Sequence, residues 1–263
     1  MSNFGTRLQA VAMTAIVALG TSYAIPAAAQ AATGTSFFEN FDALSTSRWY
    51  ISDGWRNGAH QNCGWSKQQI SVTSGVLNVG FTKAPGADGT LYQCGELQSK
   101  AYYSYGTYEA RIKTPKGSGL NAAFFSYVST PNAPKHDEID FEVLLKDTTK
   151  VQTGGFAADK GIPVSTPTLP NPSDADFINY AFVWAPGKLA YYANGKLLYQ
   201  ITNPAQVQTE PQKIYFDLWG TDTLSDWMGP FKDPGTIKMQ VDWAAYTAPG
   251  EKCLFPQSIT CSL

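Results

Sequence analysis

The sequence has 263 residues, which fits one large domain or two small ones. Hydrophobic residues make up 43% and charged residues only 15%, which excludes a disordered chain because such chains are rich in charge and poor in aromatics. The formal net charge of −2 argues against nucleic acid as a partner, since phosphate binding needs a basic surface. The composition therefore indicates a folded domain that does not bind nucleic acid.

The first 29 residues have the three parts of a secretory signal peptide. Arg7 gives a basic start, residues 10–25 are mostly apolar, and Ala27-Ala28-Ala29 supplies the small residues of a cleavage site. An uncleaved membrane anchor is the alternative, but the apolar stretch is short for one. We expect cleavage near Ala29 and export to the periplasm or the extracellular space. No later stretch is apolar enough to span a membrane, so no membrane partner is expected.

All four cysteines follow this leader. They are Cys63, Cys94, Cys253 and Cys261. An even number of cysteines in an exported chain indicates disulfides, and four cysteines allow three pairings. Proximity along the chain favours Cys63–Cys94 and Cys253–Cys261, although the residues alone leave the other pairings open. Metal binding by thiolates is the weaker alternative, because the sequence has no C-x-x-C pair.

Short runs of alternating apolar and polar residues dominate the rest of the chain. They predict strands over residues 70–72, 76–81, 108–113, 138–145, 180–184, 189–193, 196–201, 213–218 and 237–243. Residues 122–128 are mostly apolar, which predicts a strand buried on both faces. Asn194-Gly195 lies between two of these runs and predicts a tight hairpin. Many short strands without long helical periods predict an all-β sandwich or barrel. The pattern resumes after the Pro-rich stretch 165–176, so residues 30–263 are predicted to form one domain with a disulfide-bearing C-terminal tail.

The most informative segment is HDEIDFEVL, at residues 136–144. Alternate residues of a strand share one face, so Glu138, Asp140 and Glu142 project together and the apolar residues between them project into the core. Three neighbouring acids repel one another and weaken a strand. The alternative without function is a solvated sheet face whose charges are screened by salt.

Glycoside hydrolysis gives such acids a use. It needs one ionised and one protonated carboxyl group, which retaining enzymes hold about 5–5.5 Å apart. Cα atoms four residues apart on a strand are separated by about 13 Å, and two glutamates leaning together on a concave sheet close much of that gap. Repulsion of about 3 kcal/mol at that separation raises one pKa by about 2 units. We predict that Glu138 and Glu142 form this pair and that Asp140 tunes their coupling.

Residues 138–142, EIDFE, resemble the E-[IL]-D-x-E signature of glycoside hydrolase family 16, and the similarity extends over most of the mature chain. The single residue between Asp140 and Glu142 resembles the lichenase-type members, since the laminarinase type carries an extra bulge residue there. The segments SDGWRNGAHQNCGWSKQQ, YGTYEARI and LWGTDTLSDWMG are similar to secreted bacterial endo-β-1,3-1,4-glycanases that trim succinoglycan. The resemblance implies a retaining endo-β-glucanase with a concanavalin A-like jelly-roll sandwich of two sheets and a concave cleft.

The resemblance also implies a role for individual residues. Glu138 matches the nucleophile, Glu142 the acid/base and Asp140 the assisting carboxylate. Aromatic faces suit the C–H faces of pyranose rings, and amide or carboxyl groups suit their hydroxyls. The positions implied to lie around the sugar are Asn57, Glu96, Tyr127, His136 and Trp219. Cys63 and Cys94 match a disulfide that is common in bacterial lichenases.

Three of the positions near the sugar depart from the lichenase pattern. His136 replaces a tryptophan, Gln98 replaces an arginine, and Asp217 replaces an asparagine two residues before Trp219. These departures favour a bacterial exopolysaccharide, such as the acidic polymer succinoglycan, over cereal mixed-linkage glucan as the substrate. They leave the predicted hydrolysis unaffected.

No cofactor is expected for catalysis, but the resemblance implies a structural calcium on the sandwich face away from the cleft. Its ligands would be the backbone carbonyls of Asn40 and Gly75 and the carboxylate of Asp242, and hard oxygen ligands suit Ca²⁺. A solvated aspartate at the end of a strand is the alternative for Asp242.

Three other functions stay open from the sequence. A non-catalytic glucan-binding lectin has no need of three acids on one strand face, although fold alone does not decide function. A metal site on residues 136–142 is disfavoured, because one straight strand does not wrap a cation with all its polar side chains. A transglycosylase would use the same residues as a hydrolase. In each case the chain is expected to act as a monomer.

Overall fold

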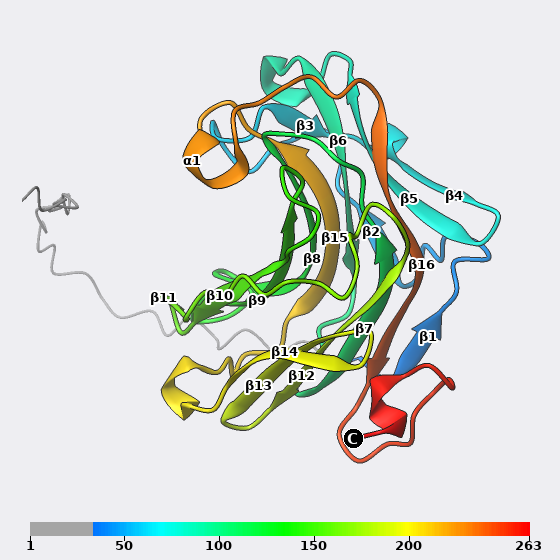
Figure 1. The fold of residues 1–263 in the computed structure, drawn as a ribbon, viewed down its shortest axis with the longest axis vertical. Coiled ribbons are helices and arrows are strands. Elements are labelled where there is room, and N and C mark those ends of the chain that lie inside the picture. The colour runs from blue at the N-terminus through cyan, green and yellow to red at the C-terminus, as the bar shows by residue number, and fades with distance from the viewer. Residues whose placement is uncertain (1–33) are drawn as a thin grey trace, which may run out of the picture.

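The computed structural model describes residues 34–263, and the predicted signal peptide at residues 1–29 lies outside them. Within the described range the chain forms sixteen β-strands, one short α-helix and a few 3-10 turns (Figure 1). The strands are β1 (Phe37–Glu39), β2 (Trp49–Ile51), β3 (Cys63–Trp65), β4 (Ile70–Thr73), β5 (Val76–Lys83), β6 (Tyr92–Ser99), β7 (Gly106–Lys113), β8 (Leu120–Val128), β9 (Asp137–Leu144), β10 (Gln152–Ala157), β11 (Lys160–Gly161), β12 (Ile178–Ala185), β13 (Lys188–Ala193), β14 (Lys196–Ile201), β15 (Lys213–Gly220) and β16 (Ile237–Thr247). The helix α1 is Ser225–Met228, and the 3-10 turns are Lys67–Gln69, Ala87–Gly89, Pro204–Gln206 and Ile259–Cys261.

The strands form two packed layers that β6 joins (Figure 1). One layer has the order β11-β10-β9-β8-β15-β6, and the other continues as β6-β5-β16-β7-β12-β13-β14. Residues 95–98 of β6 pair with β15, whereas residues 92–94 pair with β5. The all-β sandwich predicted from the sequence is confirmed, and its two sheets are continuous through β6.

Aromatic rings fill the space between the layers. Phe124 of β8 stacks on Phe216 of β15 at a centroid distance of 5.2 Å and lies 5.5 Å from Phe182 of β12. Phe141 of β9 meets Tyr191 of β13 edge-on at 5.2 Å. These five side chains are at most 2% exposed, and buried rings of this size dominate core energetics. The core therefore fixes one face of β8, β9 and β15 and leaves their other face available for a site.

All ten strands predicted from the sequence are present, and their ends differ by a few residues at most. The Asn194-Gly195 turn joins β13 to β14, and both residues have the positive φ that a two-residue hairpin of this type needs, 47° and 75°. The sequence did not predict β1, β2, β3, β6, β10 and β11. In β6 seven of eight residues are buried, so no alternation is visible, and β10 contains two glycines.

The two disulfides have the pairings that proximity favoured. Cys63 and Cys94 join β3 to β6, and Cys253–Cys261 closes a loop in the C-terminal tail. The tail lies beside β1 and β16 (Figure 1), where Phe255 is 4.7 Å from both the Phe38 and the Trp243 rings. Among residues 34–263, no helix has the length and apolar character needed to cross a bilayer.

Candidate active site

The outer face of β6, β8, β9 and β15 forms the floor of a cleft of about 500 Å³. The three acids of β9 line it, so the structure brings Glu138, Asp140 and Glu142 together on one surface as predicted. The same cleft contains four of the five positions implied to lie around the sugar. These are Asn57, Glu96, Tyr127 and Trp219.

The strand β9 is regular over the whole segment that carries the three acids. It pairs residue by residue with β8 from Asp137 to Leu144 and with β10 from Glu138 to Glu142, with no shift in register. The apolar residues that alternate with the acids are at most 4% exposed. No bulge is present in β9, which agrees with the lichenase-type spacing seen in the sequence.

Strand pairing places acids from three strands in one row across the cleft. Glu142 of β9 pairs with Ala123 of β8, Ala123 with Asp217 of β15, and Asp217 with Glu96 of β6. The short side chain of Ala123 leaves the middle of this row open. We call Glu142, Asp217 and Glu96 the acid row.

Burial keeps a proton on Glu142. It raises the pKa of Glu142 to about 7, repulsion from Glu138 adds to this, and a hydrogen bond from Asn121 Nδ2 to Oε1 at 2.9 Å opposes it. Burial also raises the pKa of Asp140 well above its usual value, with repulsion from Glu138 and Glu142 as further causes. The sequence predicted repulsion as the cause of the raised pKa of Glu142, whereas in the structure burial is the larger cause.

Burial also favours the protonated form of the other two members of the acid row. Burial raises the pKa of Glu96 to about 7, although hydrogen bonds from Ser52 and Gln98 and the charge of Lys213 oppose the rise. Burial raises the pKa of Asp217 well above its usual value, and repulsion from Glu96 adds to it. Within residues 34–263, Asp217 Oδ1 is buried and has no hydrogen-bond partner.

The sequence missed several residues of the cleft floor. Asn121 and Phe125 of β8 and Tyr215 of β15 line the cleft, as does Asp217, which the sequence marked only as a departure from the lichenase pattern. The sequence predicted residues 122–128 to be buried on both faces, whereas Ala123, Phe125 and Tyr127 line the cleft. The sequence did not indicate which strands lie beside β9.

His136 is the one position around the sugar that does not line the cleft. Its Nε2 lies 2.9 Å from Oε2 of Glu138, so the structure places it against the predicted nucleophile. The sugar-binding roles of the other four positions remain predictions.

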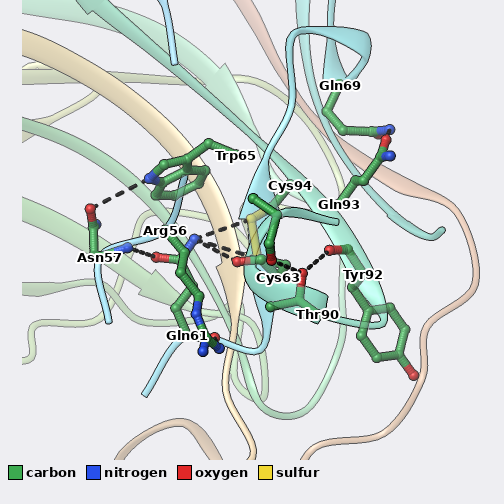
Figure 2. Close-up of a disulfide and its surroundings, with 11 residues drawn as sticks. Arg56, Asn57, Gln61, Cys63, Trp65, Gln69, Thr90, Tyr92, Gln93 and Cys94 are labelled. Carbon is green, nitrogen blue, oxygen red and sulfur yellow. Dashed lines mark hydrogen bonds between the residues drawn. A yellow bond between two sulfur atoms is a disulfide. The ribbon is translucent and has the colours of Figure 1, made fainter. Parts of the chain in front are cut away.

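Figure 2 shows how the loop that carries Asn57 is fastened beside the Cys63–Cys94 disulfide. Asn57 Oδ1 accepts a hydrogen bond from Trp65 Nε1 at 3.4 Å, and its backbone N–H donates to Gln61 Oε1 at 3.2 Å. Gln61 Nε2 in turn donates to the carbonyl of Cys63 at 3.0 Å. The disulfide therefore supports the position of a cleft residue.

The residues implied to hold calcium fit the ion in part. A Cβ added to Gly75 would lie 3.9 Å from the carbonyl oxygen of Asn40, so these two positions are neighbours. Asp242 Oδ2 accepts a hydrogen bond from Arg111 Nη1 at 2.5 Å, which leaves Oδ1 as the carboxylate oxygen for a cation. In the described part of the chain, no cluster of three or more His, Cys, Asp or Glu suits a metal ion. The calcium therefore remains a prediction.

Comparison with known proteins finds glycosyl hydrolases by family, by sequence and by structure. The model of glycosyl hydrolases family 16 matches residues 57–245. The endo-1,3-1,4-beta-glycanase ExoK of Rhizobium meliloti (strain 1021) is 46% identical over 228 residues, which cover 87% of this chain and 84% of that protein. The beta-glucanase of Bacillus subtilis (strain 168) is 34% identical over 86% of this chain and 91% of that protein. The solved structure of Bacillus licheniformis beta-glucanase matches 82% of this chain and 100% of that chain, with 32% identity and a TM-score of 0.78.

Three carboxyl groups on one strand in the cleft of a β-sandwich fit the two-carboxylate chemistry of a glycoside hydrolase. The chain belongs to glycosyl hydrolases family 16. The family, the fold class and the prediction of an enzyme are thereby confirmed, whereas the role of each residue remains a prediction.

Proposed function

We propose that the protein is an endo-1,3-1,4-β-glycanase that hydrolyses internal bonds of a β-1,3-1,4-linked polysaccharide with retention of configuration. The observation that carries this proposal is β9, where Glu138 and Glu142 lie on one unbulged strand face with Asp140 between them. Retaining hydrolysis needs such a pair, with one member protonated. The 46% identity to the endo-1,3-1,4-beta-glycanase ExoK supports the linkage.

In the first step Glu138 attacks the anomeric carbon while Glu142 donates its proton to the leaving oxygen. Burial suits Glu142 to this role, because it raises the pKa to about 7 and so retains the proton near neutral pH. The bond to the leaving sugar breaks and a neutral glycosyl ester forms on Glu138. Burial raises the pKa of Asp140 and so favours its protonated form. The protonated carboxyl group supplies a hydrogen-bond donor beside the two glutamates.

In the second step Glu142 acts as the base. The ester on Glu138 carries no charge, so its repulsion no longer favours the protonated form of Glu142. Glu142 accepts a proton from water, the oxygen of that water attacks the anomeric carbon, and Glu138 leaves as a carboxylate. Two displacements on one carbon give net retention.

The length of the cleft supports internal cutting. Tyr127 pairs with Lys213, and Trp219 lies six residues further along β15, which corresponds to about 20 Å of strand. Aromatic faces for sugar rings therefore lie at both ends of the floor, with Asn57 and Glu96 as hydrogen-bonding groups. A cleft that is open along its length accepts a chain in its middle, whereas a closed pocket accepts only an end.

The natural substrate is proposed to be a bacterial exopolysaccharide such as succinoglycan, cut outside the cytoplasm by a monomer. His136, Gln98 and Asp217 support this substrate, because they replace lichenase residues in and beside the cleft. Two disulfides and the predicted signal peptide support export. A structural calcium at Asn40, Gly75 and Asp242 belongs to the same proposal, and dialysis against a chelator should then lower the melting temperature without altering the cleavage pattern.

Product analysis on succinoglycan, lichenan and laminarin, side by side, tests the proposal. We expect the viscosity of succinoglycan to fall well before reducing ends accumulate, and the β-anomer to appear first in NMR spectra. Glu142→Gln is the matched inactive control. Cleavage of unbranched lichenan alone would overturn the natural substrate, the α-anomer would overturn the retaining mechanism, and products longer than the substrate would indicate a transglycosylase.

A further inference from the structure

His136 makes a direct contact with the predicted nucleophile. Its Nε2 lies 2.9 Å from Glu138 Oε2, and the side chains of His136 and Glu138 are only 26% and 20% exposed. A carboxylate accepts hydrogen bonds and has none to donate, so Nε2 carries the proton of this bond. The contact is therefore N–H donation to the carboxylate of Glu138.

The imidazole ring is held by neighbours on both strands beside β9. It stacks on Phe156 of β10 at 4.4 Å with an interplanar angle of 25°, and it lies 5.1 Å from Tyr127 of β8. The backbone of His136 donates to Asp159 Oδ1 at 2.9 Å and accepts from the backbone N–H of Asp159 at 2.9 Å. A ring fixed in this way is preorganised, because little rotamer freedom remains to be lost during the reaction.

The surroundings of His136 favour the imidazolium form. The hydrogen bond to Glu138 raises the pKa of His136 most, the charges of Glu138, Asp137 and Asp159 add to it, and burial opposes it. Tyr127 is the titratable side chain that faces the ring from β8. The acids around the ring lie on β9 and on the turn after β10, so negative charge reaches it from two elements.

We propose that His136 is a positioning residue for the nucleophile: as an imidazolium it orients the Glu138 carboxylate and stabilises the negative charge that returns to it when the glycosyl ester is hydrolysed. This inference rests on the retaining function proposed above. During ester hydrolysis the bond between the anomeric carbon and Glu138 breaks, and its electron pair stays on the carboxylate oxygen. A cation already in contact binds the developing carboxylate more strongly than the neutral ester, and such differential binding accelerates the step.

The two steps of the reaction depend on pH in different ways. Ester formation requires protonated Glu142. Deprotonation of Glu142 is therefore sufficient to produce an alkaline fall in kcat/KM. In ester hydrolysis Glu142 must be ionised, which produces a fall on the acid side only. An alkaline fall in the rate of ester hydrolysis therefore reports the loss of a proton other than that of Glu142. Asp140, Asp217 and Glu96 also have raised pKa values in the cleft, so the response of the fall to replacement of His136 decides its assignment.

The experiment uses aryl β-glycosides of glucan oligosaccharides with good leaving groups. Ester hydrolysis limits kcat when kcat no longer changes with the leaving group, and kcat is then measured against pH. We expect an alkaline fall in the wild type that disappears in His136→Gln, which keeps a neutral donor but not the charge. At a pH where His136 is protonated, kcat should drop about tenfold in this variant, as expected when a charged hydrogen bond becomes a neutral one.

His60→Gln is the matched control, because the chain has two histidines. His60 lies in the same cleft and meets Trp219 edge-on at 5.7 Å, so its replacement tests the loss of a cleft imidazole away from Glu138. The alkaline fall should persist in His60→Gln. The proposal is wrong if the fall persists in His136→Gln, if it disappears in His60→Gln, or if His136→Gln changes KM alone.

A second measurement needs no change at His136. In NMR titrations the pKa of His136 should fall in Glu138→Gln, because Glu138 is the largest cause of its elevation. The His60 signal is the internal reference. An unchanged His136 titration would overturn the inference. Failure of the proposed function gives a different result, namely Glu138→Gln with full activity or the α-anomer as the first product.

Discussion

Buried carboxyl groups lie both beneath the C-terminal tail and in the cleft, but their surroundings differ. Beneath the tail, burial raises the pKa of Glu109, and two donors oppose this, Ser258 Oγ at 2.5 Å and the N–H of Ile259 at 2.8 Å. In the cleft, Asp217 has no donor for Oδ1 among the described residues. Burial raises its pKa, and repulsion from Glu96 and Glu142 adds to the rise. A buried carboxyl group that accepts hydrogen bonds from nearby donors stabilises the fold. One that is surrounded by other acids lowers stability but remains available to bind a ligand.

Two consecutive residues of β9 show the same difference. Asp137 is 1% exposed, and its carboxylate accepts backbone N–H bonds from Ala158 at 2.6 Å, Thr209 at 2.7 Å and Glu210 at 2.9 Å. Glu138, the next residue, points to the opposite face and lines the cleft. Strand alternation thus separates a structural acid from the proposed nucleophile over a single residue.

The largest expected effect is on activity. Glu138→Gln and Glu142→Gln should each lower kcat by about a thousandfold or more, because each removes a group that takes part in bond making. Glu142→Gln should keep the wild-type melting temperature or exceed it, since an amide of the same shape removes repulsion within the cleft. Glu138→Gln also removes repulsion but weakens the hydrogen bond from His136, so it should melt close to the wild type. Steady-state kinetics and thermal unfolding measure the two effects, and loss of the fold in either variant would contradict the distinction between the two environments.

Azide should assign the two roles with the alanine variants and an activated substrate. In Glu142→Ala the ester still forms on Glu138, and azide attacks it in place of water to give the β-azide. In Glu138→Ala azide replaces the nucleophile itself and gives the α-azide. The reverse pattern would exchange the roles of the two glutamates.

The next effect concerns the pH dependence of kcat/KM. Burial raises the pKa of Glu142 to about 7, and the acid must be protonated for ester formation. We expect kcat/KM to fall about tenfold per pH unit above that value, because the protonated fraction falls tenfold. Hydrolysis of a polysaccharide over pH 5–9 tests this. A constant kcat/KM up to pH 9 would contradict the role of Glu142 as the acid.

The sequence predicted local features of this arrangement well. Alternation gave nine strands and the acid face of β9, because both follow from side chains two residues apart. It missed β6, whose residues are buried on both faces, and with it the structural context of Glu96. The acid row was not predictable either, since it depends on the pairing of β9, β8, β15 and β6, which are far apart in the chain. The contact between His136 and Glu138 depends on rotamers that residue spacing does not define.

A smaller effect is expected for the stability of Asp217→Asn. Its raised pKa means that the native state keeps a proton that the unfolded chain releases above about pH 4. The wild type therefore loses stability as pH rises above that value, whereas asparagine does not ionise. At pH 7 the variant should be more stable by about 1–2 kcal/mol, a rise of a few degrees in melting temperature. Near pH 3 the two proteins should melt together, and a difference of the same size at both pH values would point to packing instead.

The smallest effect is expected beneath the tail, for Ser258→Ala. The substitution removes the Oγ–H that donates to Glu109 Oε2 and leaves the Ile259 N–H that donates to Oε1. The buried carboxyl group of Glu109 therefore loses one of its two donors. We expect a loss of about 1 kcal/mol in the free energy of unfolding. Activity should stay at the wild-type value, because Ser258 belongs to the C-terminal tail and the cleft lies on β6, β8, β9 and β15. In a Glu109→Leu background the acceptor is gone, so Ser258→Ala should cost only the capping hydrogen bond that Ser258 Oγ accepts from the Thr260 N–H at 3.1 Å, and this double-mutant cycle isolates the pair. An activity loss in Ser258→Ala at an unchanged melting temperature would show that the carboxyl group beneath the tail also serves the reaction.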